Sequence, residues 1–158
     1  MISPGPEAQV GDPVALALEV LPAIVRAVSQ ATASGTERPL TLTQYRLLRR
    51  LAPGSRCTCE LAAALDLTPT TISATLETLV RRALVERLPR GDDRRTVPLA
   101  ITAAGREALA AGRARQAAAL NELAAGLSAH ERRALTTGLR GVARALRARD
   151  TLAPANSA

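Results

Sequence analysis

The chain has 158 residues, enough for one domain that buries roughly two-thirds of the surface of its unfolded state. Its formal net charge is +7 and all 21 basic residues are arginine, so the favoured partners are polyanions such as duplex nucleic acid. Tyr45 is the only aromatic residue, which argues against single-strand binders that stack bases on aromatic side chains.

The N-terminal sequence predicts neither export nor a membrane span. Residues 1–11 lack a basic region followed by an apolar run, and the apolar stretch 14–28 is interrupted by Glu19, Pro22 and Arg26. Residues 1–11 and 151–158 are rich in Pro, Gly, Ala and Ser, so both ends are predicted to be flexible tails. With only two cysteines and no disulfide framework, the sequence indicates a cytoplasmic protein.

Apolar periodicity predicts two helices in the first third of the chain. The first begins with Asp12 as N-cap and extends to about Ala33, and Pro22 is expected to kink or split it. The second is short, spans residues 43–52, and ends at Pro53 and Gly54.

The next two predicted helices are joined by only three residues, 66–68. One spans 58–65, and the other spans 69–83, with Thr68 as N-cap and Pro69 in the first helical position. Two short helices joined by so tight a turn are typical of a helix-turn-helix. The apolar face of the 69–83 helix is expected to comprise Ile72, Leu76, Leu79 and Ala83.

The opposite face of the 69–83 helix is small and polar, which suits close approach to base edges in the major groove. Its members are Thr70, Ala74, Glu77, Thr78 and Arg81.

After the 69–83 helix, residues 84–88 and 97–101 predict two strands around the charged segment 89–96. An arginine at the tip of such a hairpin can enter the minor groove.

The rest of the chain predicts two long helices. Thr102 is expected to cap an Ala-rich helix that ends near Ala125, and residues 128–131 have the form of a capping box. The last helix carries an apolar stripe of Leu135, Leu139, Val142 and Leu146. The predicted fold is therefore mainly α with a small two- or three-stranded β-wing, a winged helix-turn-helix plus a helical region.

Four motifs between residues 40 and 109 resemble the multiple antibiotic resistance regulator (MarR) family of bacterial winged-helix transcription factors. They are Leu42-Thr43-Gln44-Tyr45; Glu60-Leu61-Ala62 with Leu65; Leu84-Val85-Glu86-Arg87; and Asp93-Arg94-Arg95 followed by Leu99-Ala100-Ile101-Thr102 and Gly105. The resemblance implies a homodimer, paired through residues 12–39 and 102–150, that binds an inverted repeat in double-stranded DNA through a domain at 40–101. It also implies a repressor that a small ligand or an oxidant relieves.

The resemblance further implies which residues meet the DNA. Arg95 is expected in the minor groove, with Asp93 bracing it through an ion pair. Phosphate contacts are expected from Arg81, Arg82, Arg90 or Arg94, because Glu77 and Thr78 stand where such helices often carry basic residues. The residues expected near the major groove are Thr68, Thr70, Thr71, Ser73 and Ala74.

The two cysteines have two interpretations. Cys57 stands where Ser or Thr would cap the 58–65 helix, and Cys59 lies in its first turn, where the helix dipole favours a thiolate. Oxidation there would tilt the helix-turn-helix; alternatively, both are small, semi-buried fillers. Side chains two residues apart diverge, so no disulfide is expected between them. His130 is expected to be solvated, and neither a metal nor a cofactor is predicted.

Three other expectations concern ligands and alternatives. Family members often bind a small anionic or phenolic molecule between the dimerisation helices and the winged domain, which implies an effector site here. With one histidine, no Gly-rich phosphate loop and no metal-ligand cluster, the sequence predicts no enzyme. A winged-helix adaptor that binds protein stays open, because the same fold serves both uses.

Overall fold

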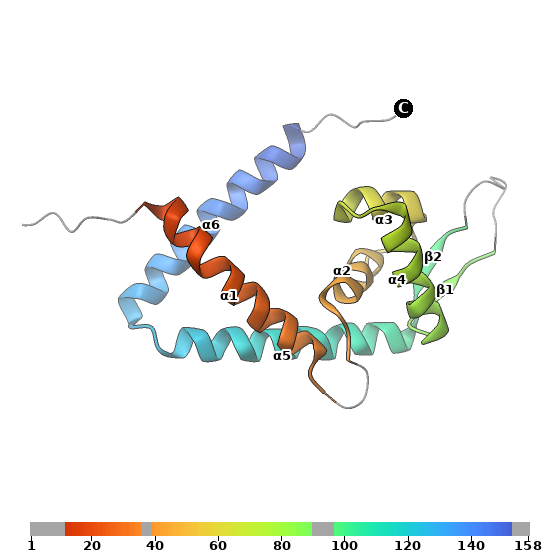
Figure 1. The fold of residues 1–158 in the computed structure, drawn as a ribbon, viewed down its shortest axis with the longest axis horizontal. Helices are drawn as coiled ribbons and strands as arrows, with labels where there is room; N and C mark the ends of the chain where they lie inside the picture. Colours follow the sequence, from red (N-terminus) through yellow and green to blue (C-terminus); the bar gives the residue numbers. More distant parts are fainter. Residues whose placement is uncertain (1–11, 36–38, 90–96, 153–158) are drawn as a thin grey trace, which may run out of the picture. The chain divides into compact units, whose positions relative to one another are not determined.

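The computed structural model describes residues 12–35, 39–89 and 97–152 (Figure 1). The predicted tail 1–11, the predicted tail beyond residue 152 and the hairpin tip 90–96 lie outside the described residues. The elements confirm the predicted class, mainly helical with a small sheet. They are α1 (Pro13–Ala33), α2 (Leu42–Leu51), α3 (Thr58–Leu65), α4 (Pro69–Arg81), β1 (Val85–Arg87), β2 (Leu99–Ile101), α5 (Ala103–Ala125) and α6 (Ala129–Leu152).

The chain divides into two compact units, Met1–Ala119 and Leu120–Ala158, which are described separately. In the first unit, α1 begins where predicted, because the Asp12 carboxylate accepts a hydrogen bond from the Val14 amide at 3.0 Å. The expected split does not occur: α1 is one helix with Pro22 inside it. A proline removes one intrahelical bond, and the turns on either side keep theirs.

Helix α1 is apolar along much of its length. By length and composition alone, it is the one helix in the described part of the chain that meets the requirements for crossing a membrane.

The last turn of α1 is held to α5 by hydrogen bonds of three side chains. Arg115 Nε donates to the Ala31 carbonyl at 3.2 Å, and Gln116 Nε2 donates to Thr32 Oγ1 at 2.7 Å. Thr32 is fully buried and donates in turn to the Val28 carbonyl at 2.6 Å.

The winged domain packs α2, α3, α4, the sheet and the start of α5 around one apolar core. The two strands pair antiparallel, with Val85 opposite Ile101 and Arg87 opposite Leu99, and Arg56 adds an isolated bridge to Leu99. The largest fully buried side chains are leucines and other aliphatics contributed by every one of the helices α2 to α4. They include Leu47, Leu48, Leu51, Leu61, Ile72, Leu79, Leu84 and Val85.

Helices α3 and α4 both end in a left-handed residue that is not glycine. At the end of α3, Asp66 has φ 52°, and the next amide, that of Leu67, donates back to the Ala62 carbonyl. At the end of α4, Ala83 has φ 54° and is exposed, so its predicted place on the buried face is wrong. The amide of Leu84 donates to the Leu79 carbonyl there, which closes a Schellman turn and redirects the chain into β1.

The first turn of α5 lies directly against the turn between α4 and β1. As predicted, Thr102 caps this helix, accepting from the Gly105 amide at 3.0 Å, and its own hydroxyl donates to the Ala83 carbonyl at 2.8 Å. Gly105 is buried, and a Cβ added there would lie 2.1 Å from the Leu84 carbonyl oxygen. Only glycine permits so close an approach between these two segments.

In the second unit, α6 follows the predicted capping box. The Glu131 carboxylate accepts from the Ser128 amide at 2.8 Å and its hydroxyl at 2.7 Å, and the Glu131 amide donates to Ser128 Oγ at 3.3 Å. The bond from the Ser128 hydroxyl, and next that from the Ser128 amide, lower the pKa of Glu131, because they favour its charged form. The apolar stripe of α6 is about half exposed: Leu135 47%, Leu139 58%, Val142 56% and Leu146 53%.

Candidate nucleic-acid interface

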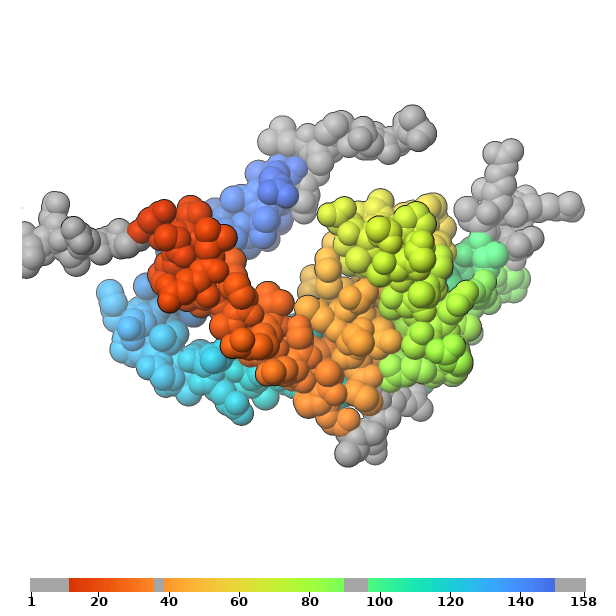
Figure 2. All heavy atoms as spheres, viewed as in Figure 1, coloured from red at the N-terminus to blue at the C-terminus, as the bar shows by residue number. Residues whose placement is uncertain are grey.

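Helix α4 lies at the surface of the winged domain (Figure 2), and its exposed residues are mostly polar. Ile72, Leu76 and Leu79 are buried in the core and fix which way the helix is turned. The predicted contact residues all lie on the first turns of α4 or at its cap, and all are exposed: Thr68, Thr70, Thr71, Ser73 and Ala74. The structure therefore brings this predicted set together on one surface.

The hydroxyl groups on α4 differ in what they bind. Thr68 caps the helix, accepting from the Thr71 amide at 3.2 Å, and the two threonine hydroxyls lie 2.8 Å apart. Thr75 and Thr78 donate back to carbonyls one turn earlier in the helix. Within the described residues, the hydroxyls of Thr70 and Ser73 have no hydrogen-bond partner. These two side chains are therefore available to a ligand on the outer face.

The helix-turn-helix is anchored to α2 by arginines. Arg46 and Arg50 of α2 donate to the carbonyls of Leu65 and Ala64 at 3.5 Å and 3.3 Å. These carbonyls belong to the last turn of α3, where a cation also complements the helix dipole. The position of α3, and with it the turn into α4, is thus set by both core packing and charge.

The two arginines at the end of α4 have different environments. Arg82 donates to Gln44 Oε1 at 3.2 Å and to the Pro39 carbonyl at 2.9 Å, so it joins α4 to the start of α2 and is not free for phosphate. Arg81 is exposed, and its one hydrogen-bond partner among the described residues is Thr78 of its own helix, at 3.4 Å. Of the two phosphate candidates, Arg81 is the one whose guanidinium faces solvent.

The wing is described at its base. Beyond the strands, the Leu88 amide donates to the Pro98 carbonyl at 2.8 Å, so the segments that follow β1 and precede β2 lie side by side at this point. The predicted residues of the tip lie outside the described residues: Arg90, Asp93, Arg94 and Arg95. Their roles stay predictions from the sequence.

Cys57 caps α3 as predicted. Its Sγ accepts from the Glu60 amide at 3.5 Å, and the Glu60 carboxylate accepts from the Cys57 amide at 2.8 Å. The second bond lowers the pKa of Glu60. Burial, and next a hydrogen bond with the Cys59 side chain, raise the pKa of the Cys57 thiol. Cys57 is therefore a protonated thiol at neutral pH, which does not favour its reaction with peroxide.

We expect Glu60→Gln to remove an acid-sensitive contribution to the stability of α3. Because folding lowers the pKa of Glu60, its charged form stabilises the fold above the unfolded pKa of about 4.3, and this contribution is lost as pH falls through the folded value. Thermal midpoints of wild type and variant should differ at about pH 7 and converge toward about pH 3. The exposed Glu107→Gln serves as control, and a gap that persists unchanged in acid would contradict the assignment.

Two cavities lie on the winged domain and its neighbour α5. One of about 500 Å³ opens between the start of α3, α4 and the sheet; among its lining residues are Cys57, Cys59, Ser73, Glu77 and Arg87. The other, of about 640 Å³, lies between α2 and α5 and is lined by Tyr45, Arg49, Ala52, Arg106, Leu109, Ala110 and Arg113.

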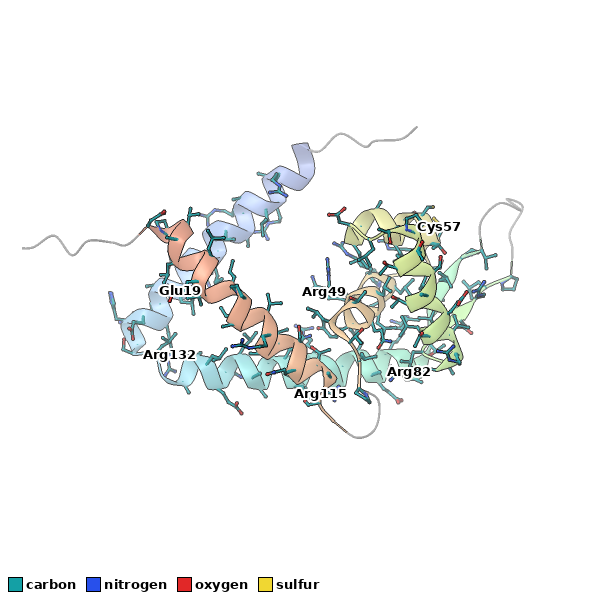
Figure 3. The ribbon with its side chains drawn as sticks, in the orientation of Figure 1. Glu19, Arg49, Cys57, Arg82, Arg115 and Arg132 are labelled. Atoms are coloured by element: carbon teal, nitrogen blue, oxygen red, sulfur yellow. The ribbon has the colours of Figure 1, made fainter. Side chains whose placement is uncertain are left out.

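The second cavity combines three guanidinium groups with an apolar floor. No Asp or Glu is among its described lining residues, and Arg106 spends one donor on the Ala52 carbonyl at 3.1 Å. Figure 3 shows Arg49 extending from α2. This arginine group was not predicted from the sequence, although the seven-residue spacing of Arg106 and Arg113 places both on one face of a helix.

Comparison with known proteins identifies the fold. The MarR family model matches residues 40–97, which span the end of the α1–α2 loop through to the return of the wing. Residues 40–97 form a MarR family domain. No curated protein matches it.

Proteins of known structure superpose on most of the chain. Escherichia coli MarR in its apo form has a TM-score of 0.71 at 22% identity, covering 85% of this chain and 98% of that one. Bacillus subtilis YusO has a TM-score of 0.71 at 20% identity, covering 89% and 99%. The Mycobacterium tuberculosis MarR family protein Rv2887, in complex with salicylic acid, has a TM-score of 0.65 at 26% identity, covering 85% and 98%.

Membership of the MarR family decides the class of function. MarR proteins are winged-helix transcription regulators that bind DNA, and they are not enzymes. The winged helix described above, with its uncovered α4, is the part of the chain that the family model covers.

Proposed function

We propose that this MarR protein acts in the cytoplasm as a homodimer that binds an inverted repeat in double-stranded DNA and represses transcription until a small ligand or an oxidant releases it. In this proposal α4 enters the major groove and the hairpin 89–96 enters the minor groove. The observation that carries it is the outer face of α4, whose small polar side chains are exposed while its apolar face is fixed in the core.

The chemistry of α4 suits base edges. Thr70 and Ser73 have hydroxyls without a partner in the described residues, and a hydroxyl can donate to or accept from either strand. Ala74 is small enough to let the backbone approach closely and can contact a thymine methyl group. Arg81, in the last turn of α4, has an exposed guanidinium that can bind a phosphate.

The experiment that tests this proposal is the variant Arg95→Ala. We expect it to weaken binding to a duplex selected from a random pool by about 1 to 3 kcal/mol, since one minor-groove guanidinium is removed per protomer. A mobility-shift titration measures the change. Arg133→Ala on α6 removes the same charge elsewhere and should bind normally; equal affinity of wild type and Arg95→Ala would refute the wing's role.

The dimer is supported by apolar side chains that each unit leaves uncovered. On α1, Val14 is 63% exposed and Leu18 is 72% exposed; on α6, the stripe from Leu135 to Leu146 is about half exposed. Contiguous exposed apolar surface of this kind marks an interaction site. A second copy of the chain fits both helices, because a two-fold axis presents the same apolar faces to each other.

We expect the double variant Leu139→Arg, Leu146→Arg to be monomeric, because two charges per protomer would be buried against apolar partners. Sedimentation at micromolar concentration measures this, and Thr137→Arg, on the opposite face of α6, is the matched control. A wild-type protein that stays monomeric, or that binds lipid vesicles through α1, would overturn the dimer.

The effector site is proposed in the cavity between α2 and α5. Its three arginines and apolar floor suit a small anion with a hydrophobic body, and the relative Rv2887 was solved with such a molecule, salicylic acid. An anion that binds one dimer conformation more tightly than the other shifts DNA affinity by that difference. Calorimetric titration with salicylate checks whether the cavity takes this class of ligand.

A further inference from the structure

We propose that Arg82 is a positioning residue for DNA binding: without contacting DNA, its guanidinium holds the end of α4 to the start of α2 and so sets the affinity for a duplex. This inference rests on the proposed role of α4 as the DNA-facing helix. Arg82 directly follows the last residue of α4, and its side chain is half-buried (Figure 3). Its Nη1 donates to Gln44 Oε1 at 3.2 Å, and its Nη2 donates to the Pro39 carbonyl at 2.9 Å.

Arg82 differs from the polar side chains of α4 in what it binds. Within the described residues, the hydrogen bonds of those side chains stay inside α4 or at its own cap. The apolar side chains of α4 are buried in the core, and apolar packing is non-directional. Two hydrogen bonds from one planar guanidinium fix both distance and direction. We therefore infer that Arg82 sets the tilt of α4 more closely than core packing alone does.

The acceptors of Arg82 lie where the chain enters α2, and this part of the chain is itself fixed. Gln44 is buried, and its Oε1 also accepts from the Thr41 amide at 3.0 Å within the capping box of α2. The Leu40 amide donates to the Thr32 carbonyl at 3.3 Å, which ties the same stretch to the end of α1. Printed on either side of Arg82 is thus a continuous series of hydrogen bonds from α1 to α4, the kind of connection that carries coupling between sites.

Affinity and its salt dependence together test the role of Arg82. Fluorescence anisotropy with a labelled duplex is measured over a range of salt for wild type, Arg82→Gln and Arg82→Lys. Both variants should lose about tenfold in affinity, because neither side chain can donate to both acceptors as the guanidinium fork does. The slope of log affinity against log salt should stay as in wild type, since no phosphate contact is lost. Wild-type affinity in either variant, or a reduced slope, would overturn the proposal.

Two further variants separate positioning from stability. Thr41→Ala removes a cap bond of α2 and keeps both acceptors of Arg82, so it should lower the thermal midpoint and bind DNA as wild type does. Gln44→Met removes one acceptor at similar volume, and adding it to Arg82→Gln should weaken DNA binding no further. An equal loss of affinity in Thr41→Ala, or additive losses in the double variant, would contradict the role given to Arg82.

Amide hydrogen exchange tests the link without DNA. In Arg82→Gln, exchange should become faster both at the end of α4 and in the first turn of α2, because each loses the same partner. Arg81→Gln, the matched change at the neighbouring position, should alter neither region. Faster exchange at the end of α4 alone, or no change, would overturn the link. If the wild-type protein binds no duplex, the proposed function fails, and this measurement still decides whether Arg82 holds the two helices together.

Discussion

Raising the salt concentration from about 50 to about 200 mM is expected to weaken duplex binding by about a thousandfold. Every basic residue of this chain is an arginine, and the proposed dimer would present two copies of Arg81 and of each wing arginine to the phosphates. About six neutralised phosphates suffice for a change of this size, because their counterions are released on binding. Fluorescence anisotropy with a labelled duplex of random sequence measures the slope.

The same titration distinguishes a DNA-binding protein from a winged-helix adaptor. Arg81→Gln should reduce the slope of log affinity against log salt by about 2 per dimer, since one phosphate contact is lost in each protomer. Thr137→Arg provides a control in which a basic residue is added on α6, outside the winged domain. Binding that is absent, or that does not depend on salt, would favour an adaptor that recognises protein.

Replacing Gly105 by alanine is expected to lower the free energy of unfolding by about 3 kcal/mol. The added Cβ would lie 2.1 Å from the Leu84 carbonyl oxygen and 2.8 Å from Ile101 Cγ1, so α5 must move away from β1 and open the core. Urea unfolding followed by circular dichroism gives the value. Gly54→Ala is the control, because nothing lies within 4 Å of the added methyl group and only a small change is expected.

A normal stability for Gly105→Ala would show that α5 and the α4–β1 turn are less tightly apposed than described. A second outcome is informative as well. If the variant folds but binds DNA weakly, the displacement of α5 has reached β2 and the base of the wing, which Thr102 joins to the Ala83 carbonyl.

The elements with strong local signals could be predicted closely from the sequence. The predicted 58–65 helix has the observed bounds of α3, and Thr68 with Pro69 marks the start of α4, because caps and a first-position proline act through neighbouring backbone. The end of α4 was missed by two residues. Its Schellman turn uses Ala83 where glycine is usual, so helical periodicity alone carried the prediction too far.

The candidate site was predictable to the extent that it depends on one helix. The face of α4 follows from which residues are apolar, and it is exposed as expected. The role of Arg82 could not be read locally, because its partners Gln44 and Pro39 are 38 and 43 residues away. The arginine-lined cavity likewise needs α2 and α5 to be placed together, and only tertiary packing does that.

The hydrogen bonds from Arg115 and Gln116 join the last turn of α1 to α5, so we expect the two to move together. Gly105 stands ten residues earlier on the same helix, a distance of about 15 Å along its axis. We therefore expect a rotation of the end of α1 to move α5 and the turn between α4 and β1, against which the first turn of α5 packs. If the proposed dimer contact uses α1, a displacement there would reach α5 through the Gln116–Thr32 hydrogen bond of 2.7 Å.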